Sequence, residues 1–279
     1  MKKYIIFLVF TSLLIQSCNK IDDPFIPLSP KEWYGKRALI EDYTGHFCPN
    51  CPDAALKAAL IDSIYGDKVV IIAIHCTDYF SRPRPPQFPE DFRTETGNIW
   101  TDFFGIANLP SGMINRINFP QKTHILTHDS WASNVSTVLS QIPDMDININ
   151  LSYDTISKKI TGSATTKFLK TIKKKLQLQL LLTEDSIIAP QQNHSVLQTN
   201  YVHRHMLRDA INGSWGSSLT TGVSPNLIAT EILYPFVYTI KQNFPQDTPG
   251  INWKHASIVA FVYDTDTYEI LQVAQKHLN

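Results

Sequence analysis

Two cysteines separated by two residues lie between a buried strand and a helix, and this arrangement limits the fold more than any other feature of the chain. The segment 43–52 reads YTGHFCPNCP and contains Cys48 and Cys51. Before it, RALIEDYTG predicts a buried strand at residues 38–42 that ends in a turn at Gly45. The cysteine pair therefore lies at the end of a strand.

The residues after the cysteines predict a helix and then a second buried strand. Residues 53–66, DAALKAALIDSIYG, have helical spacing, and one face of this helix carries Leu56, Ala59, Leu60 and Ile64. Residues 68–76, KVVIIAIHC, form a continuous apolar run, which is typical of a strand buried on both faces of a parallel sheet. Strand, helix and strand in this order predict a βαβ unit with a right-handed crossover.

The chemistry of the cysteine pair depends on where the helix begins. We expect Cys48 at the N-cap, where the unpaired amides of the first turn and the helix dipole stabilise a thiolate. Such thiols have pKa values of roughly 3.5–7.5, and the thiolate is the nucleophile. Cys51, one turn later, can then attack the mixed disulfide that Cys48 forms. His46 is a candidate for electrostatic tuning of Cys48, and an exposed turn histidine is the alternative.

Two other interpretations of the pair stay open. Cys48 and Cys51 can form a structural disulfide, or they can supply half of a zinc site. Zinc needs a second ligand pair, and only His75 and Cys76 are close in sequence, so we predict no metal and no cofactor. Cys76 is either a partner in a mixed disulfide or a buried, inert thiol.

The rest of the chain divides at Pro143. Residues 77–89 are rich in proline and predict an irregular insertion, followed by helices within 90–105 and 129–142, the second with Asp129 as its N-cap. After Pro143 the apolar residues alternate, as expected for strands. The strands are expected within residues 146–154, 158–168, 174–185, 229–240 and 256–275. This half predicts an antiparallel β-sandwich without a catalytic motif of its own.

These motifs resemble a known fold and a known family. RALIEDYTGHFCPNCP, VVIIAIHC and LPSG resemble the first motif strand, the next strand and the cis-proline turn of thioredoxin-like domains. The resemblance implies that Pro110 lies against the disulfide with a cis peptide bond and positions the substrate backbone. Glu41 and Asp42 are candidates for the buried carboxylate of thioredoxins. EDYTGHFCPNCPDA together with NYVHRHMLRDAINGSWG resembles the twenty-eight-kilodalton outer-membrane protein family of Bacteroidetes, in which a thioredoxin-like domain precedes a β-rich domain.

The first residues predict export. MKKYIIFLVFTSLLIQSC has two lysines and then an apolar stretch too short to span a bilayer, which is typical of a signal peptide. Cys18 follows the stretch and resembles the lipidated cysteine of bacterial lipoproteins. We therefore predict a lipoprotein signal peptide at 1–17 and a lipidated tether at 18–35, with the protein at the outer membrane, on the periplasmic side or the cell surface. Disulfides persist in such compartments.

The predicted protein has an α/β thioredoxin-like domain at residues 36–142 and an antiparallel β-sandwich domain at 144–279. One functional hypothesis is a thiol–disulfide oxidoreductase that acts on exported proteins. The other is a cell-surface binding or adhesion protein in which the Cys48–Cys51 bridge is a stabiliser. Equal numbers of basic and acidic residues, 25 of each, predict no nucleic-acid partner.

Overall fold

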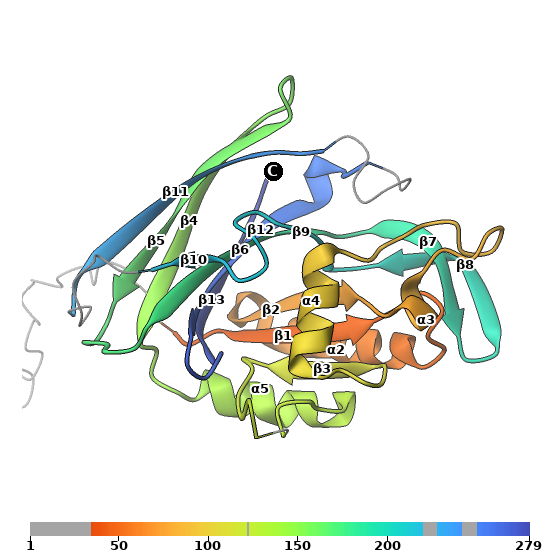
Figure 1. The fold of residues 1–279 in the computed structure, drawn as a ribbon, viewed down its shortest axis with the longest axis horizontal. Coiled ribbons are helices and arrows are strands. Elements are labelled where there is room, and N and C mark those ends of the chain that lie inside the picture. The colour runs from red at the N-terminus through yellow and green to blue at the C-terminus, as the bar shows by residue number, and fades with distance from the viewer. Residues whose placement is uncertain (1–34, 122, 220–227, 242–249) are drawn as a thin grey trace, which may run out of the picture. The chain divides into compact units, whose positions relative to one another are not determined.

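An eight-stranded sheet is the main element of the structure, and both halves of the sequence contribute strands to it (Figure 1). The computed structural model describes residues 35–121, 123–219, 228–241 and 250–279. The strand order is β13-β12-β6-β9-β2-β1-β3, and β10 pairs with β6. These strands are β1 (Ala38–Thr44), β2 (Val69–His75), β3 (Ser111–Ile114), β6 (Leu176–Glu184), β9 (Met206–Ala210), β10 (Ser217–Ser218), β12 (Ala256–Asp264) and β13 (Ile270–His277).

The predicted βαβ unit is confirmed. β1 and β2 pair in parallel, and α2 (Cys51–Tyr65) connects them together with a short 3₁₀ turn. β3 then pairs antiparallel with β1, with Asp42 opposite Gly112. A Cβ atom on Gly112 would lie 2.4 Å from the Trp131 ring, so only glycine permits this close approach of β3 to the helix behind it.

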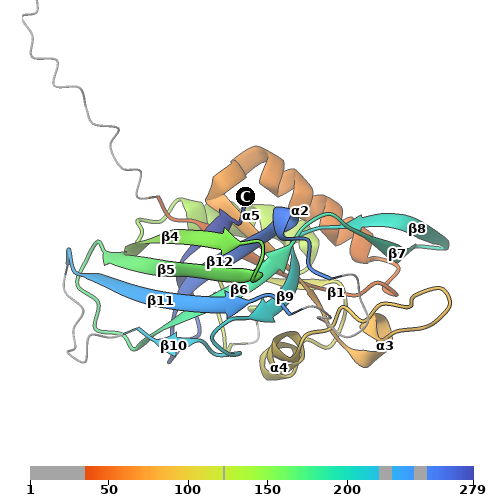
Figure 2. The same ribbon diagram turned by 90° about the horizontal axis from the view of Figure 1, so that it is seen from above.

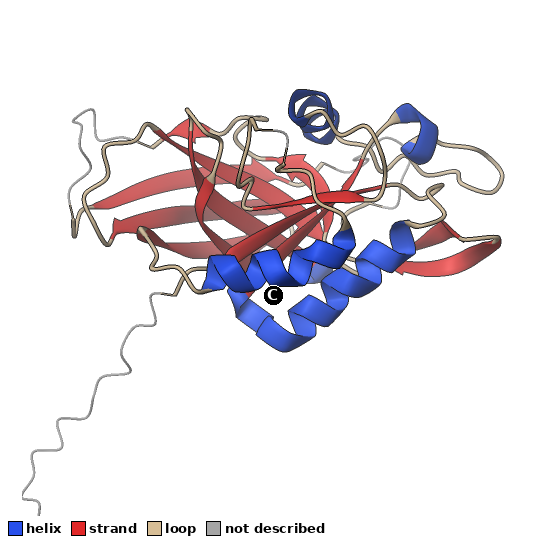
Figure 3. Ribbon diagram, turned by 90° about the horizontal axis from the view of Figure 1, so that it is seen from below, coloured by secondary structure: helices blue, strands red, loops and turns tan. Residues whose placement is uncertain are grey.

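Helices cover both faces of this part of the sheet. α2 and α5 (Trp131–Leu139) lie together on one face, and α4 (Glu95–Phe104) lies on the other (Figure 3). α2 and α5 bury a shared core against β1 and β2, with Ile40, Ile71 and Trp131 among its members. α4 buries Trp100 and Phe104 against the opposite face, where residues of β12 and β13 join the same core.

The orientation of α2 differs from the prediction. Leu56, Leu60 and Ile64 are 62%, 51% and 72% exposed, so the face on which we placed them does not face the core. The buried face instead carries Cys51, Ala54, Ala58 and Ile61. The small alanines allow the helix to lie close to the sheet, and Cys51 fixes its first turn through the disulfide.

The other helices begin a few residues away from the predicted positions. α4 begins at Glu95, because the hydroxyl of Thr94 caps it by accepting a hydrogen bond from the Gly97 amide at 2.9 Å. Asp129 is not the N-cap of α5; it lies in a 3₁₀ turn, His128–Ser130, and Ser130 occupies the cap position. The irregular segment after β2 contains a four-residue helix, α3 (Asp78–Ser81).

The alternating strands after Pro143 are confirmed. β4 (Met145–Asp154), β5 (Lys159–Phe168) and β11 (Glu231–Thr239) form a three-stranded sheet, seen side by side in Figure 2. Its inner side chains share one core with those of β6, β12 and β13; examples are Ile147, Phe168, Leu180 and Ile258. The structure also contains a hairpin that we did not predict, made of β7 (Ile187–Asn193) and β8 (Val196–His203).

The two halves of the sequence meet within the large sheet. Ala73 in β2 donates its backbone N–H to the carbonyl of His205 at 2.8 Å, just before β9. The division into domains at 36–142 and 144–279 stays a prediction, and the structure adds that the two segments share one sheet and one core cluster. The predicted signal peptide at 1–17, Cys18 and the tether up to residue 34 lie outside the described residues. None of the helices within the described ranges is long and apolar enough to cross a membrane.

Candidate functional site

A disulfide joins Cys48 and Cys51 at the start of α2, with their Cα atoms 5.4 Å apart. Cys48 is not the N-cap that we predicted: α2 begins at Cys51, and Asn50 is its N-cap. The Cys51 amide donates to the Cys48 carbonyl at 3.4 Å, which winds residues 48–51 into a turn that precedes the helix. Both cysteines are buried, with exposed fractions of 1% and 2%.

The β7–β8 hairpin covers this turn, although it follows the cysteines by some 140 residues. The side-chain amide of Gln191 donates to the Cys48 carbonyl at 3.1 Å and to the Gly45 carbonyl at 3.3 Å. Two backbone hydrogen bonds of 2.8 Å add to this contact, from Gln192 N to His46 O and from His194 N to Pro49 O. The hairpin therefore holds the backbone of the cysteine turn directly.

A cavity of about 440 Å³ lies between α2 and the hairpin. Cys51 lines it, and Cys48 is not among its lining residues. Other lining side chains are Asp42, Leu56, His75, Tyr201 and His203. The cavity thus has an apolar wall from α2 and a set of ionisable groups from β1, β2 and β8.

Two carboxylates line this cavity, a partly exposed one, Asp53, and a buried one, Asp42. Asp42 is the one that bears on the disulfide chemistry. Asp42 is 3% exposed, and its Oδ1 atom has no hydrogen-bond partner among the described residues. Burial raises the pKa of Asp42 to about 7, because the charged carboxylate loses its hydration there. The side chain therefore gains and loses a proton near neutral pH.

The neighbouring Glu41 does not lie in the cavity. Successive side chains of a strand point to opposite faces, so Glu41 lies on the far face of β1. There the Nε and Nη2 atoms of Arg116 donate to its two carboxylate oxygens at 2.8 and 2.6 Å. Aromatic rings surround the guanidinium, with centroids 4.6–5.7 Å away, from Trp100, Phe104, Phe261 and Tyr263. Of the two carboxylates that we considered, only Asp42 lies in a cavity with a cysteine.

His75 and His203 line the cavity and His46 lies close to them, and burial lowers the pKa of all three histidines. The pKa of His46 falls to about 4 and that of His203 to about 3, while the pKa of His75 falls well below its ordinary value. Burial thus favours the neutral imidazole in all three. His46 is 1% exposed, so the alternative of an exposed turn histidine is wrong, while its tuning of Cys48 stays a prediction. Its Nε2 lies 3.2 Å from the Arg82 carbonyl, and its ring stacks on Phe88.

The other predicted site residues are Cys76 and Pro110. Cys76 is a free, fully buried thiol whose pKa burial raises to about 12, which agrees with the inert alternative. The Leu109–Pro110 peptide bond is cis, as predicted, while the role of Pro110 in positioning a substrate stays a prediction. Within the described ranges, no three or more His, Cys, Asp or Glu side chains are grouped so that they could hold a metal ion.

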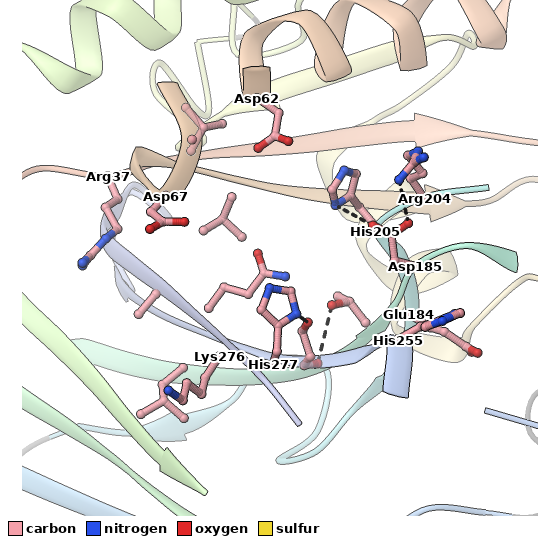
Figure 4. A pocket seen from close by; sticks show the side chains of 18 of the residues that line it. Arg37, Asp62, Asp67, Glu184, Asp185, Arg204, His205, His255, Lys276 and His277 are labelled. Carbon is pink, nitrogen blue, oxygen red and sulfur yellow. Dashed lines mark hydrogen bonds and ion pairs between the residues drawn. The ribbon is translucent and has the colours of Figure 1, made fainter. Parts of the chain in front are cut away.

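A second cavity, of about 910 Å³, adjoins the first, since Ala59, Arg204 and His205 line both, and it contains no cysteine (Figure 4). Its lining is strongly polar and carries both signs of charge. Asp185 accepts from Arg204 at 3.3 Å and lies 3.7 Å from His205, and the Ser257 hydroxyl lies 2.8 Å from Nδ1 of His277. No sequence pattern predicts this cavity, because its lining residues come from seven separate segments of the chain.

The described residues form a mixed α/β protein that consists mostly of sheet, with a buried disulfide at the start of a helix. The chain belongs to the family of outer membrane protein Omp28, whose family model matches residues 98–279. The protein is therefore one of the outer membrane. The matched residues do not include Cys48 and Cys51, so membership alone assigns no role to the disulfide.

Solved structures with a similar fold include HBP35 of Porphyromonas gingivalis, with a TM-score of 0.66, 16% identity, and coverage of 88% of this chain and 76% of that chain. A protein from Agrobacterium tumefaciens has a TM-score of 0.51 and 9% identity, over 88% of this chain and 96% of that one. A domain of the outer membrane lipoprotein Omp28 from P. gingivalis is 26% identical over 50% of this chain and 91% of that chain, with a TM-score of 0.34. A search of curated protein sequences found no match.

Proposed function

We propose that this chain is an outer-membrane lipoprotein that carries out thiol–disulfide exchange on exported proteins through Cys48 and Cys51. In this proposal, residues 36–142 are a thioredoxin-like domain and residues 144–279 a β-sandwich. The observation that supports it most is the presence of Asp42, a buried carboxylate with a pKa near 7, in the cavity that Cys51 lines.

Each group has a defined part in the exchange. The Cys48 thiolate attacks a sulfur of the substrate disulfide, forms a mixed disulfide and releases the first substrate thiolate. Asp42 takes the proton of the Cys51 thiol, because a base with a pKa near the working pH transfers protons efficiently. The Cys51 thiolate then attacks the Cys48 sulfur, which restores the Cys48–Cys51 bond and releases the second substrate thiolate. Pro110 positions the substrate backbone.

The burial of the two cysteines supports a second function. With exposed fractions of 1% and 2%, neither sulfur is accessible to a protein substrate unless the β7–β8 hairpin moves. In the alternative, the protein binds or adheres to ligands at the cell surface, and the disulfide only stabilises the fold.

The reduction potential of the Cys48–Cys51 couple separates these functions. A value between about −120 and −270 mV belongs to catalytic pairs, and a value below about −300 mV belongs to structural disulfides. The measurement equilibrates the protein with thiol buffers of known potential and counts free thiols by alkylation and mass spectrometry. A Cys48→Ser, Cys51→Ser protein that keeps its surface ligand would support the second function.

Lipidation is tested independently. We expect the exported wild-type protein to carry a diacylglyceryl group on Cys18 and to partition with membranes. Several acyl chains hold a folded domain on a bilayer, each buried CH₂ contributing about 0.8 kcal/mol. Cys18→Ser should release the protein into the soluble fraction, and an unchanged membrane fraction would contradict the lipid anchor.

A further inference from the structure

We infer that a low-molecular-weight polar thiol reduces the Cys48–Cys51 disulfide by entering the cavity of about 440 Å³ and attacking the sulfur of Cys51. This inference rests on the proposed redox function and names the electron donor for it. In the proposed exchange with protein substrates, Cys48 is the cysteine that reacts with the other molecule. In the reduction by the small thiol, that cysteine is Cys51.

The first support is the difference in access between the two cysteines. Cys51 lines the cavity and Cys48 does not. The hairpin, moreover, holds the Cys48 backbone through the Gln191 side chain, and it lies beside the start of α2 (Figure 2). A cavity of this volume falls within the range of small-molecule sites, about 300–1,000 Å³. A folded protein does not fit into it, whereas a small thiol does.

The second support is the set of unpaired polar atoms in the cavity lining. Oδ1 of Asp42, Nε2 of His203 and both ring nitrogens of His75 have no hydrogen-bond partner among the described residues. All three side chains are more than nine-tenths buried and line the cavity. Buried polar groups are normally hydrogen-bonded. These atoms have almost no accessible surface, so a polar occupant of the cavity pairs with them once the side chains turn toward it. Neutral imidazoles offer both donors and acceptors, which suits a thiol with an amino or hydroxyl group.

The reaction balances without another reactant. The incoming thiol gives its proton to the Asp42 carboxylate, and its thiolate attacks the sulfur of Cys51. The bond between Cys48 and Cys51 breaks, a bond between Cys51 and the small thiol forms, and Cys48 leaves as a thiolate that takes up a proton. A second molecule of thiol attacks the sulfur of the bound one. Two thiols become one small disulfide, and the protein disulfide becomes two thiols.

The two sulfurs can be compared one at a time in the folded, full-length protein. Cys48→Ser and Cys51→Ser are each made together with Cys18→Ser, which leaves one reactive cysteine besides the buried Cys76. Each protein is treated with cystamine, the disulfide of a small aminothiol, and adduct formation is followed by intact mass spectrometry. Cystamine gives Cys51 the same kind of mixed disulfide that the incoming thiol would form. We expect the Cys51 thiol to react at least tenfold faster than the Cys48 thiol.

Filling the cavity provides the second measurement. Ala55→Trp, on the cavity wall, should slow the Cys51 reaction about tenfold, and Ala132→Trp, on the exposed face of α5, should leave it unchanged. If Ala55→Trp does not fold, Ala55→Leu is used. A faster Cys48 reaction, or equal rates in the two alanine variants, would overturn the inference while leaving the proposed function intact. A reduction potential in the structural range together with a faster Cys51 reaction would instead remove the proposed function and leave the cavity as a thiol-accessible site.

Discussion

Glu41 and Asp42 are adjacent carboxylates of β1, both buried, and their surroundings are opposite in kind. Glu41 is fully paired: Arg116 binds both of its oxygens, and aromatic rings from both halves of the chain surround the guanidinium. Asp42 has an unpaired oxygen and lines the cavity of Cys51. Among the described residues, Glu41 thus has a charged partner for both oxygens, whereas Asp42 has an oxygen without one. We infer that Glu41 stabilises the fold and that Asp42 exchanges protons.

The largest effect is expected on the Glu41 side. Arg116→Met removes the partner and leaves a charge buried, so we expect the free energy of unfolding to fall by about 3–5 kcal/mol. Urea unfolding followed by tryptophan fluorescence measures this loss. The double variant Glu41→Leu, Arg116→Met removes both charges and should recover much of the stability. A loss below about 1 kcal/mol in the single variant would show that the pair is not a structural element.

Asp42→Asn should change how stability depends on pH. The folded-state pKa of Asp42 is raised to about 7 from an ordinary 3.8, so the folded protein keeps a proton that the unfolded chain has released. This contribution is fully present below about pH 4 and is lost as the pH rises to about 7. Relative to Asp42→Asn, the wild type should therefore lose roughly 2–4 kcal/mol across this window.

The buried histidines act in the opposite direction but do not disturb this difference. Because the pKa values of His46 and His203 are lowered to about 4 and about 3, acidification below about pH 6.5 destabilises both proteins alike. Unfolding curves at several pH values give the difference directly. Parallel curves for the wild type and Asp42→Asn would contradict a raised pKa for Asp42.

A smaller effect on stability is expected when the β7–β8 hairpin loses its side-chain hydrogen bonds to the cysteine turn. Gln191→Ala removes the side-chain bonds to the carbonyls of Cys48 and Gly45, which should cost about 1–2 kcal/mol. It should also speed reduction of the disulfide by dithiothreitol, measured by rapid alkylation. Gln192→Ala is the matched control, because its amide bonds only the exposed carbonyl of His194. Equal reduction rates in the two variants would show that Gln191 does not restrict access.

The smallest effect tests the aromatic surroundings of Arg116. Phe104→Leu removes one ring, 4.7 Å from the guanidinium, and should cost about 1 kcal/mol. Phe103→Leu is the control on the neighbouring residue, which is 42% exposed and has no such contact with Arg116. Thermal unfolding of the two variants gives the comparison. A larger loss in Phe103→Leu would show that the ring contacts of Phe103 with Phe119, Trp215 and Tyr268 contribute more to stability than the contact of Phe104 with Arg116.

Local sequence patterns predicted those elements of the fold that form from residues close together in the chain. The βαβ unit, the cis bond at Pro110 and the alternating strands after Pro143 follow from periodicity, turn residues and motif resemblance. The prediction of which face of α2 is buried was wrong, because the large apolar residues of this helix are exposed and alanines make core contacts. Hydrophobicity alone favoured the larger side chains.

The surroundings of the site depend on contacts between distant parts of the sequence, and no local signal marks them. The pairing of Glu41 with Arg116 spans 75 residues, and that of Cys48 with Gln191 spans 143. Which of two adjacent carboxylates lines the cavity of Cys51 depends on which face of β1 each side chain occupies. The sequence provides the candidates, and only the fold distinguishes between them.

The late position of the hairpin in the chain has a consequence for the order of events during export. Secretion delivers a chain from its N-terminal end, so Cys48 and Cys51 reach an oxidising compartment well before residues 187–203 arrive to cover them. An oxidant as large as a protein can reach the two thiols during this interval and loses access once the hairpin has docked. From then on, the redox state of the pair changes only through reactants small enough to enter the cavity or through a movement of the hairpin.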